Sequence, residues 1–340
     1  SWADPNKRLS CIKKFFTSYS NEEGYIGDTQ IRRSFKNALI EFSEFNPIAV
    51  IGIITLLKEK FGLDTTAGIH MLDTSAGWGG RLVGALADQR VMSYTGFDPN
   101  TKMREAYSKL SEIYSEQSTT AVRMFCKPSE ELTRSDIEKD VDGSSGFSSQ
   151  FDLLLTSPPY WNTEKYSNEP TQSWKRYPDL TDWTIDYLFQ TLFKAASFLK
   201  IGGFAAINIA DVRKEKQIKG KVELWQARIC EPMLQFLTNN LQMDYLGCVA
   251  YPIGSKNEPM WLLRKTCEVQ TPFNRDSLLL GQDENWKKLE KKSSSKKDMK
   301  RKVEVFNKEN PEENGVENFK NPISAHWRGA LELPSNHLQL

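Results

Sequence analysis

The residues best suited to chemistry lie in Ser157-Pro158-Pro159-Tyr160, directly after the apolar run 151–155. Because proline fixes its backbone and cannot donate to a sheet ladder, the chain should leave the strand here in an extended shape. The Ser157 hydroxyl and the Pro158 carbonyl would then face the crevice beyond the strand ends, where ligands bind in open α/β sheets. Two acceptors there can hydrogen-bond the protons of an aromatic amino group and direct its lone pair at an incoming methyl group, while Tyr160 stacks on the ring. The alternative is a proline turn that packs after a buried strand.

A glycine-rich turn between an apolar run and an amphipathic stretch is the second candidate. Glycines allow a ligand to approach the backbone closely, and the free N–H groups at the start of the following helix would point at it. Asp98 follows the next apolar run, where a carboxylate can accept hydrogen bonds from both hydroxyls of a ribose. The pattern predicts a nucleoside-type cofactor, with a purely structural turn as the alternative, and it lacks the spacing of a phosphate-binding loop. The candidate cofactor-binding residues are Asp73, Ser75, Ala76, Gly77, Trp78, Gly79, Arg81, Asp98 and Pro99.

Two residues of this turn leave alternatives open. Trp78 could cover a bound cofactor or pack beneath it. Arg81 could pair with a carboxylate of the cofactor, or it could be a solvated cation at the start of the helix.

Between residues 66 and 268, short apolar runs alternate with longer amphipathic stretches, which is typical of a parallel α/β sheet covered on both faces. We expect a catalytic domain over this range. The expected strands are 69–72, 93–97, 151–155, 204–209 and 246–251, and the expected helices are 81–87, 101–114, 183–199 and 222–239.

The two ends of the chain differ from this central domain. Residues 1–65 show helical spacing at 31–45 and 48–61 and are predicted to form a helical extension, which could form part of the cofactor or substrate site. Residues 269–340 form a Lys/Glu-rich tail with few apolar residues, predicted to be largely disordered or loosely docked. Its basic run, 286–302, could bind phosphates or act as a nuclear signal, with a solvated linker as the default interpretation.

Composition excludes several classes of protein. No run approaches the ~20 apolar residues of a membrane-spanning helix, and the first twenty residues lack the apolar core of a signal peptide. The five cysteines and three histidines are scattered, so neither disulfides nor a metal site is expected. We therefore expect an intracellular protein, nuclear in a eukaryote and otherwise cytoplasmic. The net charge of +1 does not decide for or against a polyanionic partner.

The two chemical segments resemble motifs of the amino-methyltransferases of DNA. Residues 73–80 are similar to the family's cofactor motif. Thr156-Ser157-Pro158-Pro159-Tyr160 is similar to its catalytic motif, in the version typical of the cytosine-N4 branch. Residues 199–209 resemble the next helix, turn and strand of the family, and Phe45-Asn46-Pro47 resembles its cofactor-flanking segment. The resemblance covers about residues 45–265.

The resemblance implies an α/β fold of the Rossmann-like class I methyltransferase type, with seven mostly parallel strands. It implies S-adenosylmethionine as cofactor, with Asn46, Pro47 and Thr156 among the residues around it. The implied reaction is methylation of a nucleic-acid base on its exocyclic amino nitrogen, first N4 of cytosine in DNA and next N6 of adenine. An RNA base or an inactive nucleic-acid-binding subunit stays open. Ser157 argues against a glutamine methyltransferase, which usually has Asn at this position.

The polar segment after the catalytic motif is expected to hold the target base. In the resembled family the corresponding loop helps to hold a base that has been flipped out of the helix. A solvated loop is the alternative. Because no long insertion suggests a recognition domain, a partner subunit could supply target specificity. The candidate substrate-binding residues are Trp161, Asn162, Tyr166, Gln172 and Arg176.

Overall fold

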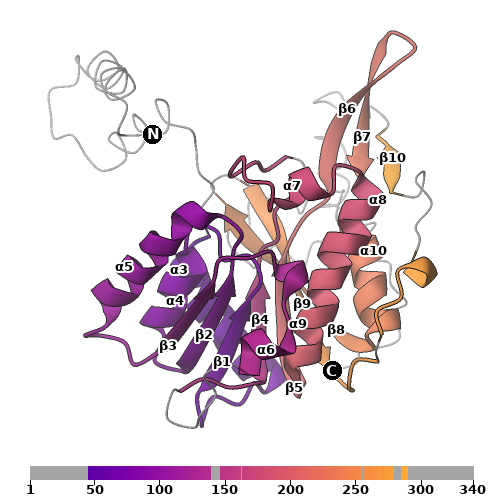
Figure 1. The fold of residues 1–340 in the computed structure, drawn as a ribbon. Coiled ribbons are helices and arrows are strands. Elements are labelled where there is room, and N and C mark those ends of the chain that lie inside the picture. Colours follow the sequence, from indigo (N-terminus) through magenta and orange to yellow (C-terminus); the bar gives the residue numbers. More distant parts are fainter. Residues whose placement is uncertain are drawn as a thin grey trace, which may run out of the picture.

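In the computed structural model, a seven-stranded sheet runs through the molecule with helices against both faces (Figure 1). The structure describes residues 45–138, 146–161, 163–253, 256–270, 272–278 and 285–289. The strands of this sheet are β1 (Ile69–Asp73), β2 (Val91–Phe97), β3 (Ala121–Phe125), β4 (Phe151–Thr156), β5 (Leu199–Asn208), β8 (Met243–Ile253) and β9 (Lys256–Lys265).

The strands lie in the order β3-β2-β1-β4-β5-β9-β8. Strands β1 to β5 are parallel, and β9 runs antiparallel to both of its neighbours. This topology confirms the expected Rossmann-like class I methyltransferase sheet of seven, mostly parallel strands. The order reverses between β1 and β4, and such a switch point opens a crevice at the carboxyl ends of the two strands.

The central strands are continuous apolar runs because both faces of the sheet are covered. In β4, Leu153 and Leu155 belong to one hydrophobic core, whereas Leu154 belongs to the core on the opposite face. The first core contains α3 (Pro47–Phe61), α4 (Gly80–Ala87) and Tyr107 of α5 (Arg104–Tyr114), and the second contains α6 (Arg134–Glu138), α9 (Gln190–Phe198) and α10 (Cys230–Gln235). The remaining helical segments are Thr101–Met103, Ser129–Glu131, α7 (Ser173–Arg176), α8 (Leu180–Asp182), Trp183–Phe189, Phe236–Asn240 and Asp276–Leu278.

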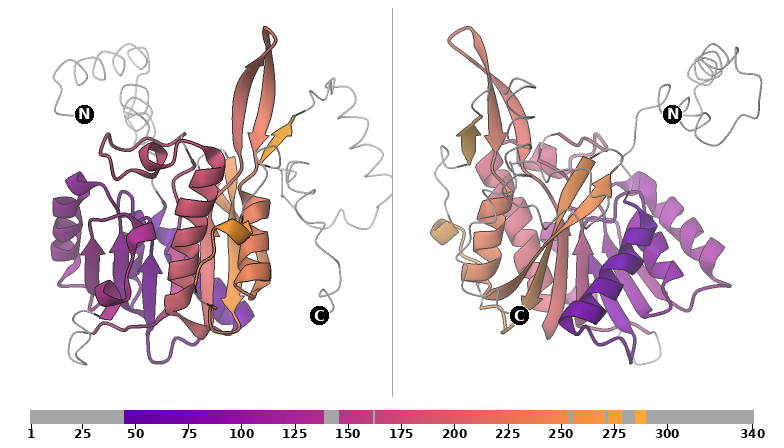
Figure 2. Two further views of the ribbon diagram at one scale, coloured as in Figure 1. Left: turned by 45° about the vertical axis from the view of Figure 1, so that its right-hand side comes forward. Right: turned by 180° about the vertical axis from the view of Figure 1, so that it is seen from behind.

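A second, three-stranded antiparallel sheet projects from the body (Figure 2). It consists of the hairpin β6 (Val212–Ile218) and β7 (Lys221–Ala227), with β10 (Trp286–Lys288) along the outer side of β7. The expected helix over 222–239 is therefore wrong in its first third, because these residues pair with β6 and α10 starts only at Cys230. Strands β3 and β9 were not expected either.

The two ends of the described chain pack on the central domain. Helix α3 lies where the segment 48–61 was expected to be helical, and it packs against α4. In the predicted tail, Phe273 contacts Phe193 at 5.3 Å between ring centroids, and Arg275 pairs with Asp182 and Asp186. Residues 31–44 and 290–340, on which the remaining expectations for the two ends fall, lie outside the described residues. No helix of the described chain is long and apolar enough to cross a membrane.

Candidate active site

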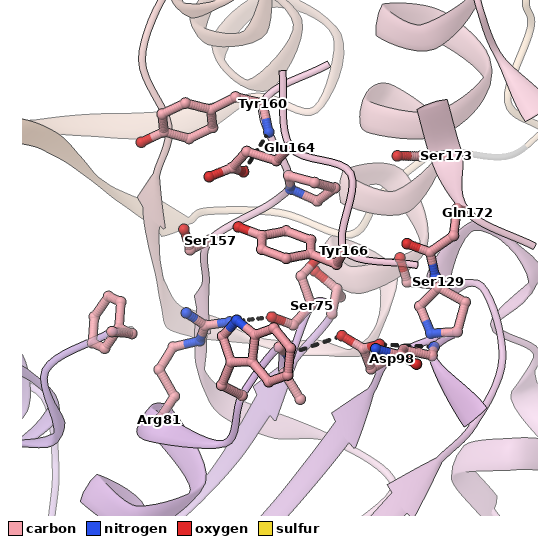
Figure 3. Close-up of a pocket in the computed structure, with 18 of the residues that line it drawn as sticks. Ser75, Arg81, Asp98, Ser129, Ser157, Tyr160, Glu164, Tyr166, Gln172 and Ser173 are labelled. Carbon is pink, nitrogen blue, oxygen red and sulfur yellow. Dashed lines mark hydrogen bonds between the residues drawn. The ribbon is translucent and has the colours of Figure 1, made fainter. Parts of the chain in front are cut away.

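A pocket opens at the switch point of the sheet, where the carboxyl ends of β1, β2 and β4 meet (Figure 3). Its open space, including the part that is open to solvent, is about 1070 Å³. The same space is lined by residues of the glycine-rich turn, by Asp98 and by residues of the Ser-Pro-Pro-Tyr segment. The two motifs that the sequence analysis singled out therefore face each other across one cavity.

The turn after β1 is fixed around Gly77, whose φ of +57° favours glycine. Its backbone N–H donates to Asp98 Oδ2 at 2.9 Å, and its carbonyl accepts a hydrogen bond from the Tyr107 hydroxyl at 2.5 Å. Gly79, with φ of +89°, is the N-cap of α4. The turn is thus held by hydrogen bonds to two later residues: Asp98, directly after β2, and Tyr107 of α5.

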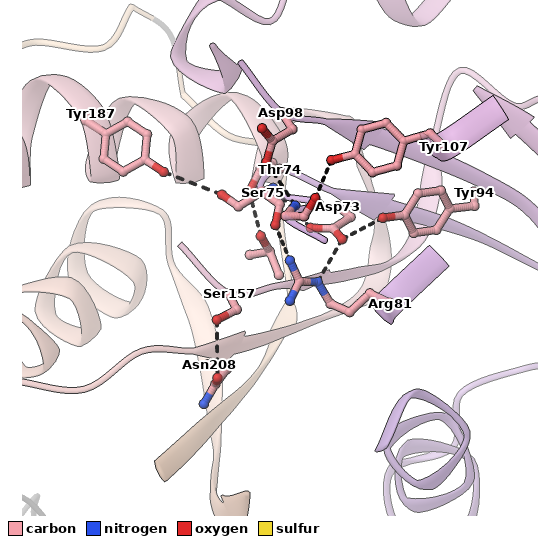
Figure 4. A network of polar contacts seen from close by, with 12 residues as sticks. Asp73, Thr74, Ser75, Arg81, Tyr94, Asp98, Tyr107, Ser157, Tyr187 and Asn208 are labelled. Carbon is pink, nitrogen blue, oxygen red and sulfur yellow. Dashed lines mark hydrogen bonds and ion pairs between the residues drawn. The ribbon is translucent and has the colours of Figure 1, made fainter. Parts of the chain in front are cut away.

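A buried ion pair supports the turn from below (Figure 4). Asp73 Oδ2 accepts hydrogen bonds from Arg81 Nε at 2.7 Å and from the Tyr94 hydroxyl at 2.6 Å, and Oδ1 accepts one from the backbone of Ser75 at 3.0 Å. Arg81 also donates to the Ser75 carbonyl, and its guanidinium lies 4.9 Å from the ring centroid of Phe45. Asp73 is thus fully engaged within the protein, and the solvated alternative for Arg81 is wrong because this side chain is only 4% exposed.

Asp98 stands at the end of β2 with its carboxylate at the pocket wall. Its two oxygens accept hydrogen bonds from the backbone of Gly77 and Asn100, both at 2.9 Å. Burial nevertheless raises the pKa of Asp98 to about 6, because the desolvation of the charge outweighs these hydrogen bonds. The side chain changes its charge close to neutral pH, in a place that suits a hydroxyl-bearing ligand.

The Ser157 hydroxyl has a defined orientation. Asn208, at the end of β5, donates from Nδ2 to the Pro259 carbonyl at 3.0 Å. A carbonyl only accepts, so the Asn208 amide must turn its Oδ1 toward Ser157, 3.3 Å away. Ser157 is then the donor in this hydrogen bond, and its oxygen lone pairs remain available to the pocket.

The remainder of the catalytic segment is held from several sides. The Thr74 and Thr156 hydroxyls, 3.0 Å apart, connect the ends of β1 and β4. Two carboxylates bind Tyr160: its hydroxyl donates to Glu258, and its backbone N–H donates to Glu164 Oε2 at 2.9 Å. Both carboxylates line the pocket, and burial raises the pKa of Glu164.

The segment after Tyr160 forms the roof of the pocket. Tyr166 packs edge-on against Trp78, with ring centroids 6.1 Å apart, so Trp78 lines the cavity rather than packing beneath the turn. Gln172 lies at the Asp98 end of the pocket, next to Ser129 (Figure 3). Its Nε2 is buried and makes no hydrogen bond within the described chain, which leaves one donor in this part of the pocket for a ligand.

Most of the predicted site residues come together here. Those that do not line the pocket have structural contacts: Asn46 caps α3, Pro47 begins it, and Trp161 packs against Trp286. Arg176 pairs with Glu130 and Glu131, and Asn162 lies outside the described residues. Four further predicted residues do not line the pocket: Asp73, Gly79, Thr156 and Pro158. The predicted residues that line it are Ser75, Ala76, Gly77, Trp78, Arg81, Asp98, Pro99, Ser157, Pro159, Tyr160, Tyr166 and Gln172.

Sequence reasoning missed several residues of the pocket. Asn208 had a usable signal, because it is the one polar residue within the apolar run 204–209. Tyr187, Tyr251 and Glu258 had none, since they lie in a helix and in strands remote from both motifs. Within the described residues, no three His, Cys, Asp or Glu side chains gather as metal ligands.

Comparisons with known proteins give likenesses of fold only. No protein-family model matches the chain, and no curated protein does. TrmN from Thermus thermophilus matches with a TM-score of 0.42 and 15% identity over 69% of this chain and 53% of that one, so the chain spans about half of its length. A putative class I S-adenosylmethionine-dependent methyltransferase from Listeria monocytogenes matches with 0.41 and 13%, over 77% and 76% of the two chains. A putative rRNA-methylase from Clostridium thermocellum matches with 0.37 and 15%, over 67% and 99%. At these TM-scores the likenesses support no argument about activity, and the strand order carries the fold assignment.

Proposed function

We propose that this protein is an S-adenosylmethionine-dependent methyltransferase that methylates the exocyclic amino nitrogen of a nucleic-acid base. One observation carries the proposal. The pocket at the switch point joins a ribose-type carboxylate, Asp98, to the oriented hydroxyl of Ser157 in a Ser-Pro-Pro-Tyr segment. A cofactor with a ribose and an acceptor that bears an amino group can therefore meet in one cavity.

The pocket residues fit this cofactor. The Asp98 carboxylate would accept from the ribose hydroxyls, and the buried donor of Gln172 lies at the same end, where it would bind an acceptor atom of the adenine ring. We therefore assign Gln172 to the cofactor rather than to the target base. When bound, S-adenosylmethionine supplies a sulfonium methyl group that is already electrophilic, so the protein has mainly to orient the amino nitrogen.

The catalytic segment would orient that nitrogen through its acceptors. Asn208 holds the proton of the Ser157 hydroxyl away from the pocket, so this oxygen can accept a hydrogen bond from one N–H of the amino group. The Pro158 carbonyl, expected to be the second acceptor, does not line the pocket, so another pocket acceptor would have to take the second hydrogen bond and leave the nitrogen lone pair free to attack. The ring of Tyr160, fixed through Glu258 and Glu164, would stack on the base, a contact of roughly 1–3 kcal/mol.

Cytosine N4 in DNA is the first choice for the acceptor, because Ser157 matches the cytosine-N4 version of the motif. Adenine N6 is the second choice, and a base of RNA is the alternative polymer. A partner subunit could add target specificity.

The test is transfer of a labelled methyl group. The protein is incubated with methyl-labelled S-adenosylmethionine and, separately, with mixed DNA and mixed RNA, and the digested nucleosides are analysed by mass spectrometry. We expect labelled N4-methylcytosine from DNA. Ser157→Ala should abolish it, Tyr160→Ala should reduce it strongly, and Tyr160→Phe, which keeps the ring, should retain more activity than Tyr160→Ala.

Ser108→Ala, an exposed change in α5, is the matched control and should leave transfer unchanged. Measurable cofactor binding without transfer to any nucleic acid would overturn the enzyme proposal in favour of a binding subunit. Label that appears only in RNA would move the substrate from DNA to RNA and leave the mechanism in place.

A further inference from the structure

The projecting sheet of β6, β7 and β10, here called the arm, is the most basic element of the described chain outside the pocket. Its residues, 212–227 and 286–288, contain seven Lys or Arg and two Glu, whereas the whole chain has a net charge of +1. Its longest strands have seven residues, so at about 3.3 Å per residue the hairpin is about 20 Å long. No feature of the proposed transfer step uses it.

The cations of the arm are concentrated on one face. Side chains alternate along a strand, and the pairing places Lys214, Trp225 and Lys288 side by side across the three strands, with Lys216 and Lys221 on the same face. Glu223 also lies on this face and pairs with Lys288 at 2.7 Å, so Lys214, Lys216 and Lys221 carry its net charge. Lys216 follows on the same face, with its ammonium 5.0 Å from the ring centroid of Trp225 and 3.7 Å from that of Trp286. Two indole rings thus hold the Lys216 side chain in place, which lowers the entropy lost when this lysine binds an anion.

This face continues to the mouth of the pocket. Lys214 lies 5.1 Å from the ring centroid of Trp161, the residue after Tyr160, and Trp161 packs against Trp286 of the arm. Trp161 has φ of +37°, which turns the chain sharply after the catalytic segment. The Lys165 charge is near enough to lower the pKa of Lys214, after the larger effect of burial. Lys165, in the segment after Tyr160, and Lys214 of the arm therefore lie near one another.

We propose that this face of the arm binds the phosphates of the DNA strand that carries the target base. The proposal rests on the proposed function, because the arm gains its meaning from a base held next to Tyr160. The regular spacing of cations along extended strands suits a polyanion better than a compact anionic ligand. At 3.4 Å per nucleotide, about 20 Å of arm corresponds to about six nucleotides beyond the target. The arm would then position the target strand, a role that the sequence did not suggest.

The experiment compares two faces of the same arm. The double variant Lys216→Gln and Lys221→Gln removes two charges from the proposed binding face, and the control Arg213→Gln and Lys287→Gln removes two from the other face. Binding of a fluorescent 24-nucleotide single-stranded DNA is followed by anisotropy over a range of salt concentrations. Circular dichroism melting and S-adenosylmethionine affinity verify that both variants are folded.

We expect the binding-face variant to weaken DNA binding roughly tenfold near 0.1 M salt, and to reduce the slope of log Kd against log salt by about 1.4, since each lost phosphate contact removes about 0.7. The control should stay within twofold of the unchanged protein. A three-nucleotide DNA should bind the unchanged protein and the binding-face variant equally weakly, because it does not reach along the arm. Equal loss in both variants, no loss in either, or tighter binding of an RNA of the same sequence would overturn the proposal.

The DNA-binding and methyl-transfer measurements together distinguish failure of the arm proposal from failure of the proposed function. If the arm binds DNA with the expected face dependence but no methyl group is transferred, the methyltransferase proposal fails and the arm is a nucleic-acid-binding surface on its own. If methyl transfer to DNA proceeds while both arm variants bind DNA like the unchanged protein, the arm proposal fails and the active site stands.

Discussion

A short series of hydrogen bonds decides which atoms of the active site can act as acceptors. The Pro259 carbonyl fixes Asn208, and Asn208 in turn makes Ser157 a donor on the side away from the pocket. A serine hydroxyl that rotates freely would present its proton to the substrate part of the time. The positioning residue Asn208 therefore matters although it transfers nothing.

We expect Asn208→Ala to lower kcat roughly ten- to a hundredfold with little change in KM, because the Ser157 acceptor is no longer oriented in the transition state. Asn208→Asp is the informative partner variant. Its protonated carboxyl can make both hydrogen bonds, so its residual kcat should decline as pH rises, whereas kcat of Asn208→Ala should not. Steady-state kinetics on the DNA substrate between pH 6.5 and 9 measures both, and equal profiles for the two variants would contradict the positioning role.

On the proposed function, Asp98 would make cofactor binding depend on pH. Its pKa is raised to about 6 by burial, and only the charged form accepts hydrogen bonds from two ribose hydroxyls. Above pH 6 the carboxylate is present and the affinity should be constant. Below pH 6 protonation competes with binding, so the Kd should rise up to tenfold per pH unit. Calorimetric titration with S-adenosylmethionine from pH 5 to 8 tests this, and Asp98→Asn should bind weakly with no such dependence; a flat profile for the unchanged protein would disprove it.

At the scale of elements, the position of α4 sets the position of the cofactor turn. The turn leads into α4 at Gly80, and Arg81 in its first turn holds Asp73. Helix α3 lies against α4 at Gly84, where a Cβ would come within 2.5 Å of the Pro47 carbonyl and of Val50. The extension before the sheet thus reaches the pocket in two ways: Phe45 lines it, and α3 packs closely on α4, whereas Asn46 and Pro47 do not line it.

Gly84→Ala should therefore lower the free energy of unfolding by about 1–3 kcal/mol, because overpacking outweighs the better helix propensity of alanine. It should also weaken cofactor binding, since α4 must shift. Gly52→Ala, in the interior of α3 with nothing within 4 Å of the new Cβ, is the control and should stabilise by about 0.5–1 kcal/mol. Urea unfolding measures both, and a stabilised Gly84→Ala would show that the two helices can separate without cost.

At the scale of the whole molecule, the strand order brings the two halves of the site together. The chain passes from β1 outward to β3 and returns to place β4 on the other side of β1. The cofactor turn and the catalytic segment, about 80 residues apart, therefore end at one edge. The arm leaves from this same edge, after Asn208, so the proposed DNA path and the pocket share one side of the molecule (Figure 2).

The sequence by itself determined the local units of this protein. The turn with its glycines, Asp98 and the Ser-Pro-Pro-Tyr segment could be found because each depends on neighbours in the chain: an apolar run, a residue type that permits or fixes the backbone, and a polar side chain. Local patterns of apolar and polar residues also predicted the parallel sheet and most of its strands. The role of Arg81 could not be chosen, since its burial depends on Phe45 and Tyr94.

Only the tertiary structure decided which distant residues complete the site. Tyr251 and Glu258 reach the pocket because β8 and β9 continue the sheet beyond β5, and no local pattern encodes that pairing. Residues 222–227 had the composition of a helix, and pairing with β6 made them a strand. The arm therefore stayed hidden in the sequence, because its basic face is formed by strands that come together from two distant parts of the chain.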